Sequence, residues 1–144
     1  MLRLMVIDDD PLQAEIMRRL LKAHDGVEAS IFQTADAAIE QLHKTKRAHF
    51  PHLVVLDLRM PGLDGHAVQR VLGEDERLRA IPVVVLSGST LEHDAAQAYE
   101  LGASAYLHKP DELDDLRELL ADLVGLWWRV TPRPGGAAAP SVVS

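Results

Sequence analysis

Three aspartates, each at the end of a short apolar run, are the residues of this sequence best suited to chemistry. Asp8 and Asp9 follow the apolar residues 4–7, and Asp57 directly follows the apolar residues 53–56. Crowded carboxylates repel one another, and burying them without a counterion is costly. A hard divalent cation relieves that repulsion, and an all-oxygen ligand set without histidine or cysteine favours Mg²⁺.

Two further side chains complete a set suited to phosphoryl transfer. Lys109 offers a point charge for one phosphoryl oxygen, and the hydroxyl of Ser87 can donate a hydrogen bond to another. A metal, a lysine, a hydroxyl and a carboxylate nucleophile are the groups that transfer of a phosphoryl group onto a carboxylate requires. Asp57 is the expected acceptor because its strand is central. Taken alone, Asp57 could equally cap the Pro-Gly turn that follows it.

The expected metal ligands are the carboxylates of Asp9 and Asp57 and the backbone carbonyl of Arg59, with Asp8 reached through water. Asp10 is left outside this site because a residue of its type directly before a proline is a helix N-cap. The seven histidines contain no pair spaced as metal ligands, so none is assigned to a metal.

The apolar pattern predicts five strands that alternate with five helices. The strands are expected at residues 4–7, 27–32, 53–56, 81–86 and 103–108. Each helix has an expected cap or capping box, at Asp10, Thr34, Asp64, residues 89–92 and Asp111. In the third helix Val68, Val71 and Leu72 are expected to face inward, and in the fifth Leu113, Leu116, Leu120, Leu123 and Trp127.

Strands that each precede a helix predict an α/β fold with a parallel sheet covered on both faces. Right-handed crossovers then favour a flavodoxin-like (βα)5 doubly wound sheet with strand order 2-1-3-4-5. The carboxyl ends of all five strands meet at one edge of such a sheet. That edge is therefore expected to gather Asp8, Asp9, Asp57, Ser87 and Lys109.

Composition narrows the possible environment and partners. The length of 144 residues suits one domain, expected over residues 1–130, and the Pro-, Gly- and Ala-rich residues 131–144 are expected to form a disordered tail. A net charge of −7 argues against nucleic acid as the main partner. No apolar run reaches the length of a membrane span, and the absence of cysteine fits a cytoplasmic protein.

With these motifs in place, residues 2–128 resemble the receiver domain of bacterial two-component response regulators. The matching motifs are Asp8-Asp9, Asp57 with residues 60–65, Ser87-Gly88, Gly102-Ala103, and Tyr106 three residues before Lys109-Pro110. The resemblance implies that Asp57 accepts a phosphoryl group from the phosphohistidine of a sensor histidine kinase. It also implies a cis peptide bond between Lys109 and Pro110, and a switch pair, Ser87 and Tyr106, that alters the surface of the fourth helix, fifth strand and fifth helix.

The end of the last expected helix adds a narrower resemblance. Residues 126–130, followed closely by proline, are similar to the same region of small regulators paired with phytochrome-type kinases. Such stand-alone receivers form homodimers through this end of the chain, so a homodimer is expected. Trp127 and Trp128 themselves fit either a buried core or an exposed sticky patch.

The favoured function is therefore a non-enzymatic, single-domain phosphoacceptor whose output is a protein–protein contact, or alternatively an intermediate that relays the phosphoryl group to a histidine phosphotransfer protein. A haloacid-dehalogenase-type phosphatase needs an acid two residues after its nucleophile, where this chain has Arg59. An FMN-binding flavodoxin needs a phosphate-binding loop after its first strand. In this chain residues 8–10 at that position are all acidic and would repel a phosphate. His66 and His108 are expected only to tune the entrance to the site.

Overall fold

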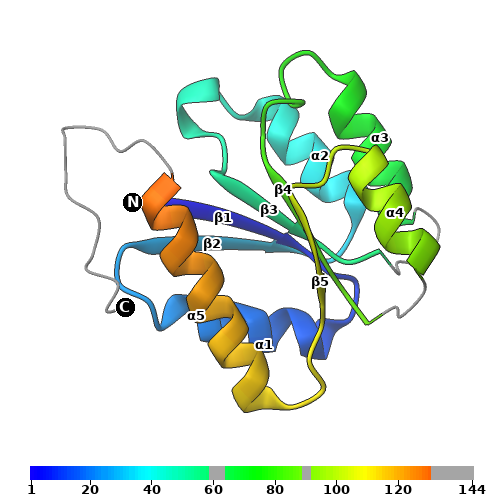
Figure 1. Cartoon of the computed structure of the whole chain (residues 1–144). Helices are drawn as coiled ribbons and strands as arrows, with labels where there is room; N and C mark the ends of the chain where they lie inside the picture. Colours follow the sequence, from blue (N-terminus) through cyan, green and yellow to red (C-terminus); the bar gives the residue numbers. More distant parts are fainter. Residues whose placement is uncertain (59–63, 89–91, 131–144) are drawn as a thin grey trace.

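The computed structural model describes residues 1–58, 64–88 and 92–130 of the chain. Its centre is one parallel five-stranded sheet with strand order β2-β1-β3-β4-β5 (Figure 1). The strands are β1 (Leu2–Ile7), β2 (Val27–Phe32), β3 (Leu53–Leu56), β4 (Val83–Ser87) and β5 (Ala105–His108). The predicted flavodoxin-like order is thus confirmed. We call the two ends of the sheet the carboxyl-end edge and the amino-end edge, after the strand ends that meet there.

The helices lie on both faces of the sheet. They are α1 (Pro11–Lys22), α2 (Ala35–Lys44), α3 (Gly65–Glu74), α4 (Glu92–Glu100) and α5 (Leu113–Val130), with a short 3-10 helix η1 (Arg47–His49). Helices α1 and α5 cover one face, whereas α2, α3 and α4 lie on the other (Figure 1). None of the described helices is both long enough and apolar enough to span a membrane.

The strands bury side chains on both faces, which explains their nearly continuous apolar sequences. In β1 the alternate residues Leu2, Leu4 and Val6 pack with α1 and α5, while Met5 and Ile7 pack with α2 and α3. Burying one such side chain stabilises the fold by about 1.5–3 kcal/mol. Side chains of β1 and β3 pack on both faces of the sheet, so packing from both sides positions these two strands.

Local caps fix where the first three helices begin. The carboxylate of Asp10 accepts hydrogen bonds from the backbone N–H groups of Leu12 and Gln13, and Asp64 accepts one from Ala67. Thr34 caps α2 in the same way, so these three predicted caps are confirmed. The expected capping box at residues 89–92 lies partly outside the described residues. Helix α5 begins at Leu113, which places Glu112, and not the predicted Asp111, immediately before it.

Two inward positions were predicted incorrectly. Val71 is 38% exposed, whereas Gln69 is buried. The buried face of α3 consists of Gly65 and the residues three, four and seven positions after it, and position 71 lies beside that face. Leu113, the first residue of α5, is 49% exposed, so the buried stripe of that helix begins later.

The strand bounds also differ slightly from the prediction. The fourth strand begins at Val83 and runs to Ser87, since the residues before it belong to the turn that leaves α3. The fifth begins at Ala105, because Gly102, with a φ of 99°, ends α4 and starts a short connection.

The tryptophan pair belongs to the core and does not form an exposed patch. Trp127 is 9% exposed and donates a hydrogen bond from Nε1 to the backbone carbonyl of His52, at 3.1 Å. Trp128 packs over Gly26, where an added Cβ would lie 3.0 Å from Trp128 Cζ2. Gly26 also has a φ of 76°, which a residue with a side chain rarely adopts. The end of α5 is therefore anchored over the amino-end edge.

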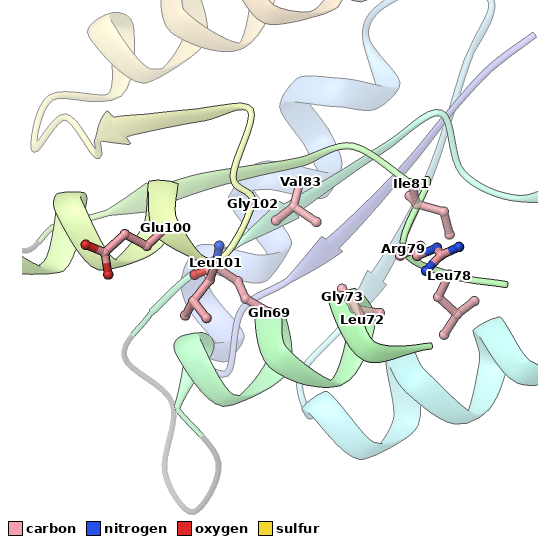
Figure 2. Close-up of a pocket in the computed structure, with 10 residues that line it drawn as sticks. All are labelled: Gln69, Leu72, Gly73, Leu78, Arg79, Ile81, Val83, Glu100, Leu101 and Gly102. Atoms are coloured by element: carbon pink, nitrogen blue, oxygen red, sulfur yellow. The ribbon is translucent and has the colours of Figure 1, made fainter. Parts of the chain in front are cut away.

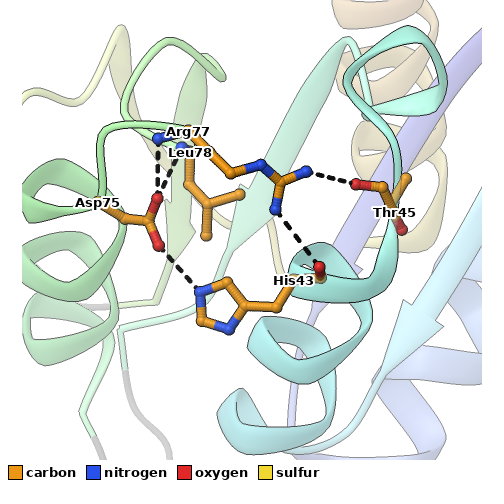
Figure 3. Close-up of polar contacts among 5 residues, drawn as sticks. All are labelled: His43, Thr45, Asp75, Arg77 and Leu78. Atoms are coloured by element: carbon orange, nitrogen blue, oxygen red, sulfur yellow. Dashed lines mark hydrogen bonds and ion pairs between the residues drawn. The ribbon is translucent and has the colours of Figure 1, made fainter.

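Charged side chains at the amino-end edge are paired with fixed partners (Figure 3). The guanidinium group of Arg77 donates to the carbonyl oxygens of His43, at 3.3 Å, and Thr45, at 2.8 Å. The carboxylate of Asp75 contacts His43 Nε2 at 2.9 Å and accepts the backbone N–H groups of Arg77 and Leu78. These bonds, that with His43 first, lower the pKa of Asp75. They fasten the loop after α3 to the end of α2.

Candidate metal and phosphoacceptor site

The structure brings three carboxylates together at the carboxyl-end edge. Oxygen atoms of Asp8, Asp9 and Asp57 lie within 4.8 Å of one another. The pairing of β1 with β3 causes this, because Ile7 and Leu56 are register partners and the next backbone N–H, that of Asp57, donates to the carbonyl of Ile7 at 3.0 Å. Two neighbouring parallel strands thus deliver their following residues to the same place.

Among the residues that the structure describes, Lys109 brings a positive charge to these carboxylates. Its Nζ donates to Oδ2 of Asp8 at 2.6 Å and lies 3.8 Å from Oδ2 of Asp57. The side chain of Asp8 is 3% exposed and that of Lys109 is 13% exposed, so this ion pair is shielded from water. Oδ1 of Asp8 accepts the backbone N–H of Asp10 at 3.1 Å. One ammonium group therefore serves two carboxylates of the cluster.

The expected cis peptide bond before Pro110 is wrong for this structure, since no described peptide bond is cis. The lysine reaches the cluster along a trans chain. The backbone N–H of Lys109 donates to the carbonyl of Ser87 at 2.8 Å, and Ser87 pairs in register with His108. This extension of the β4–β5 ladder holds Lys109 beside the carboxylates without a change of peptide isomer.

The two residues of the expected switch pair lie on adjacent strands. Ser87 is fully buried at the end of β4, and Tyr106 is partly buried on β5, where it packs with Leu58, Val85, Ala98 and Ala103. Sequence reasoning missed Tyr99, whose hydroxyl accepts the backbone N–H of Tyr106 at 3.0 Å and so links α4 to β5. Its sequence offers no signal for this, because the contact depends on how α4 crosses the strand.

The remaining expected residues fall in three different places. Arg59 lies outside the described residues. His108 is exposed at the end of β5, whereas His66 is partly buried on α3 and faces α4. Asp10 caps α1, as expected, although it also borders the site.

A cavity of about 300 Å³ opens onto the carboxylate cluster. It is lined by Asp8, Asp10, Gln13, Asp57, Gly88, Lys109, Pro110 and Asp111. A Cβ added to Gly88 would meet nothing within 4 Å, so the space next to Ser87 is open. Gln13 and Asp111 were not foreseen as lining residues, because their sequence positions match ordinary helix and turn roles.

The chemistry of these donors fits a hard divalent cation. The three carboxylates are the group that the described residues offer for a metal, and all their ligand atoms are oxygens. Mg²⁺ and Mn²⁺ prefer such ligands, whereas zinc and copper sites use imidazole or thiolate. A cation here would offset the repulsion among the three carboxylates.

The chain is similar to members of one protein family. The family model of the response regulator receiver domain matches residues 4–121. The probable methanogenesis regulatory protein FilR2 of Methanothrix harundinacea is 41% identical over 96 residues, which are 65% of this chain and 62% of FilR2. The chain thus spans less than two thirds of that relative. Response regulator Rcp1 of Synechocystis sp. is 27% identical over 135 residues, 91% of this chain and 92% of Rcp1.

Two solved structures show the same fold along almost the whole chain. The Mn(2+)-bound form of Rcp1 matches with a TM-score of 0.80 at 27% identity, covering 94% of this chain and 100% of that one. The phosphorylated cyanobacterial phytochrome response regulator RcpA matches with a TM-score of 0.81 at 26% identity, covering 92% and 98%. Fold, acidic cluster and matched residues lead to one conclusion. The chain belongs to the response regulator receiver domain family.

Proposed function

We propose that this chain is a phosphoacceptor signalling protein in which Asp57 receives a phosphoryl group from the phosphohistidine of a sensor histidine kinase. The observation that carries the proposal is the cluster of Asp8, Asp9 and Asp57 beside Lys109 at one open cavity. In the reaction an oxygen of Asp57 forms a bond to phosphorus, the bond from phosphorus to the imidazole nitrogen breaks, and that nitrogen keeps its electron pair and takes up a proton.

The surrounding side chains have separate proposed roles in binding the metal and the phosphoryl group. Asp9, Asp57 and the carbonyl of Arg59 would bind Mg²⁺, with Asp8 reaching it through water. A bound cation supplies positive charge against the phosphoryl oxygens. The direct bond between Asp8 and Lys109 supports an outer role for Asp8, because one oxygen of that carboxylate is already engaged. Lys109, 3.8 Å from Asp57, needs only a small movement to contact a phosphoryl oxygen on that residue.

Ser87 and Tyr106 are the proposed switch residues. The Ser87 hydroxyl would donate to the phosphoryl group, and Tyr106 would move inward. The proposal is supported by the place of Tyr106 on the edge strand β5, beside Ala98 of α4. A change there alters the surface formed by α4, β5 and α5, which we propose as the binding and homodimer surface of a regulator over residues 1–130, with residues 131–144 as a tail.

A phytochrome-type kinase is the proposed partner. This proposal is supported by the similarity to RcpA, described as a phytochrome response regulator, and by the near-complete coverage of Rcp1. A reaction between two such proteins would take place in the cytoplasm, where both kinase and regulator domains meet.

The test is transfer of phosphate to the full chain from acetyl phosphate and from candidate histidine kinases, followed by intact mass and peptide mapping. We expect one phosphoryl group on Asp57 with Mg²⁺ and none with excess EDTA. Labelling of another residue, or labelling that does not need a divalent cation, would overturn the proposal.

The kinase panel tests the partner separately. Phytochrome-type and unrelated histidine kinases are compared by the rate at which each loses its phosphohistidine to the chain. Faster transfer from an unrelated class would refute the partner while leaving Asp57 as the acceptor.

A further inference from the structure

A buried amide joins α3 to α4. Gln69, 3% exposed on α3, donates from Nε2 to the backbone carbonyl of Ala98 on α4 at 3.0 Å. Figure 2 shows Gln69 between the two helices, close to where α4 ends. A carbonyl can only accept, so the amide nitrogen must face Ala98 and the amide oxygen must face away from it. That oxygen lies 3.1 Å from Nδ1 of His66.

The orientation of Gln69 fixes the proton of the neutral His66 ring. Because Gln69 Oε1 accepts, Nδ1 of His66 must donate, which leaves a lone pair on Nε2. Nε2 is buried and has no hydrogen-bond partner among the described residues. Oδ1 of Asp94 on α4 lies 3.7 Å from this nitrogen.

A lone pair that faces a carboxylate is unfavourable, whereas a proton on the same nitrogen turns the contact into an ion pair. The side chains of His66 and Asp94 are only 12% and 18% exposed, so water weakens this difference little. Among the described residues, His93 on α4 is a further titratable group at this contact. Its Nε2 lies 3.3 Å from Asp94 Oδ1, but its side chain is 73% exposed.

Helix α4 has little apolar packing to hold it in place. Ala98 is its one buried residue in the described range. A cavity of about 310 Å³ lies at its end, lined by residues that include Gly73 of α3 and Leu101 and Gly102 after α4 (Figure 2). A polar contact between α3 and α4 therefore matters more for holding α4 in place than it would in a densely packed pair of helices.

The other end of this contact is connected to Asp57. The backbone N–H of Gly65, the first residue of α3, donates to the carbonyl of Leu58 at 2.9 Å. A Cβ on Gly65 would lie 2.5 Å from the Cα of Leu58, so the two backbones are in close contact. His66 thus follows a rigid junction with the residue next to the phosphoacceptor.

We infer that His66 and Gln69 are positioning residues that couple Asp57 to α4, and that protonation of His66 strengthens their hold on the packing described here. The inference rests on the proposed function, because it concerns how phosphorylation of Asp57 moves α4. An imidazole gains its proton as the pH falls from about 8 to about 5. Lower pH therefore opposes displacement of α4, and displacement of α4 in turn lowers the proton affinity of His66.

The test follows the ring carbon signals of His66 by NMR across a pH series, with and without Mg²⁺ and beryllofluoride, a phosphoryl mimic. We expect the pH of half-protonation of His66 to fall by roughly 0.7 units on loading, which corresponds to about a five-fold coupling. In Asp94→Asn the two titrations should coincide. His93→Gln, which removes the exposed neighbour of the same carboxylate, is the matched control and should keep the shift.

Each result bears on the coupling in a different way. If beryllofluoride binds but the His66 titration does not move, or if His93→Gln removes the shift, the inference is overturned. If beryllofluoride does not bind, the proposed function fails. The free protein then still tests the contact, because Asp94→Asn must lower the pH of half-protonation of His66, and an unchanged value overturns the inference independently.

Discussion

The charged side chains at the two edges of the sheet have different surroundings. At the amino-end edge, the guanidinium groups of Arg3 and Arg77 donate to backbone carbonyls, and Asp75 contacts His43 and two backbone N–H groups. At the carboxyl-end edge, three carboxylates crowd around Lys109. The bonds at the first edge satisfy these three side chains within the chain, so they contribute to stability. The second gathers three carboxylates beside Lys109, so it is suited to bind a cation and, with that cation, a phosphoryl group.

Asp57→Asn gives the largest expected effect and should change chemistry without harming the fold. Labelling by acetyl phosphate should fall by more than about 10³-fold, because the nucleophile is lost. Stability without metal should stay equal or rise, since one of three mutually repelling carboxylates becomes neutral. Intact mass and urea unfolding measure the two effects.

Asp10→Asn is the control for this prediction. Asparagine caps helices as well as aspartate does, so both labelling and stability should remain near the native values. A loss of labelling as large as that of Asp57→Asn would show that the acceptor has been misidentified.

Lys109→Met should reduce stability by about 3 kcal/mol in the absence of metal, because it leaves the buried carboxylate of Asp8 without its ammonium partner. Added Mg²⁺ should restore more stability to this variant than to the native chain, since the cation then replaces the missing charge. Urea unfolding with MgCl₂ and with EDTA measures both effects.

Lys44→Met removes an exposed ion pair with Glu40 and should leave stability close to that of the native chain, because water screens the two charges. If Lys109→Met were as mild as this control, the buried carboxylate of Asp8 would not depend on Lys109 for its counterion.

Arg77→Gln should cost about 1–2 kcal/mol and leave labelling of Asp57 unchanged. The variant loses two hydrogen bonds to carbonyls and the stacking of the guanidinium carbon 5.2 Å above the Phe50 ring. Arg79→Gln, an exposed neighbour, should change neither quantity. Slower labelling of Arg77→Gln would show that the two edges are coupled.

Asp75→Asn gives the smallest effect, visible only in the pH dependence of stability. The pKa of Asp75 is lowered in the folded chain, so its contribution is fully present above the ordinary carboxyl range and is lost as the pH falls through the folded value. The native chain should therefore lose more stability than Asp75→Asn between roughly pH 5 and pH 2. Thermal unfolding at several pH values measures this.

Glu76→Gln, which removes an exposed carboxyl beside Asp75, should follow the native pH profile. Parallel profiles for the native chain and Asp75→Asn would mean that the contact with His43 adds nothing to stability.

Strand order and three helix caps could be predicted because both depend on local patterns. Apolar runs mark strands buried on two faces, and a residue such as Asp64 needs only the next turn of chain to act as a cap. Convergence of Asp8, Asp9 and Asp57 followed from strand order alone, since parallel strands end at the same edge.

The errors arose where tertiary contacts decide. Gln69 is polar in sequence but buried, because the carbonyl of Ala98 on another helix satisfies its amide. The bond of Lys109 to Asp8 also joins residues that are 101 positions apart in the sequence. No local pattern records such long-range partners.

The anchoring of the last helix determines which spectroscopic probe suits this protein. The chain has two tryptophans, and Trp127 is bonded to His52, just before β3, whereas Asp57 lies just after that strand. At about 3.3 Å per residue the two ends of this stretch are roughly 16 Å apart. Intrinsic tryptophan fluorescence should therefore report unfolding well and ion binding poorly. A tryptophan introduced nearer the acidic cluster would be needed to follow a magnesium titration by fluorescence.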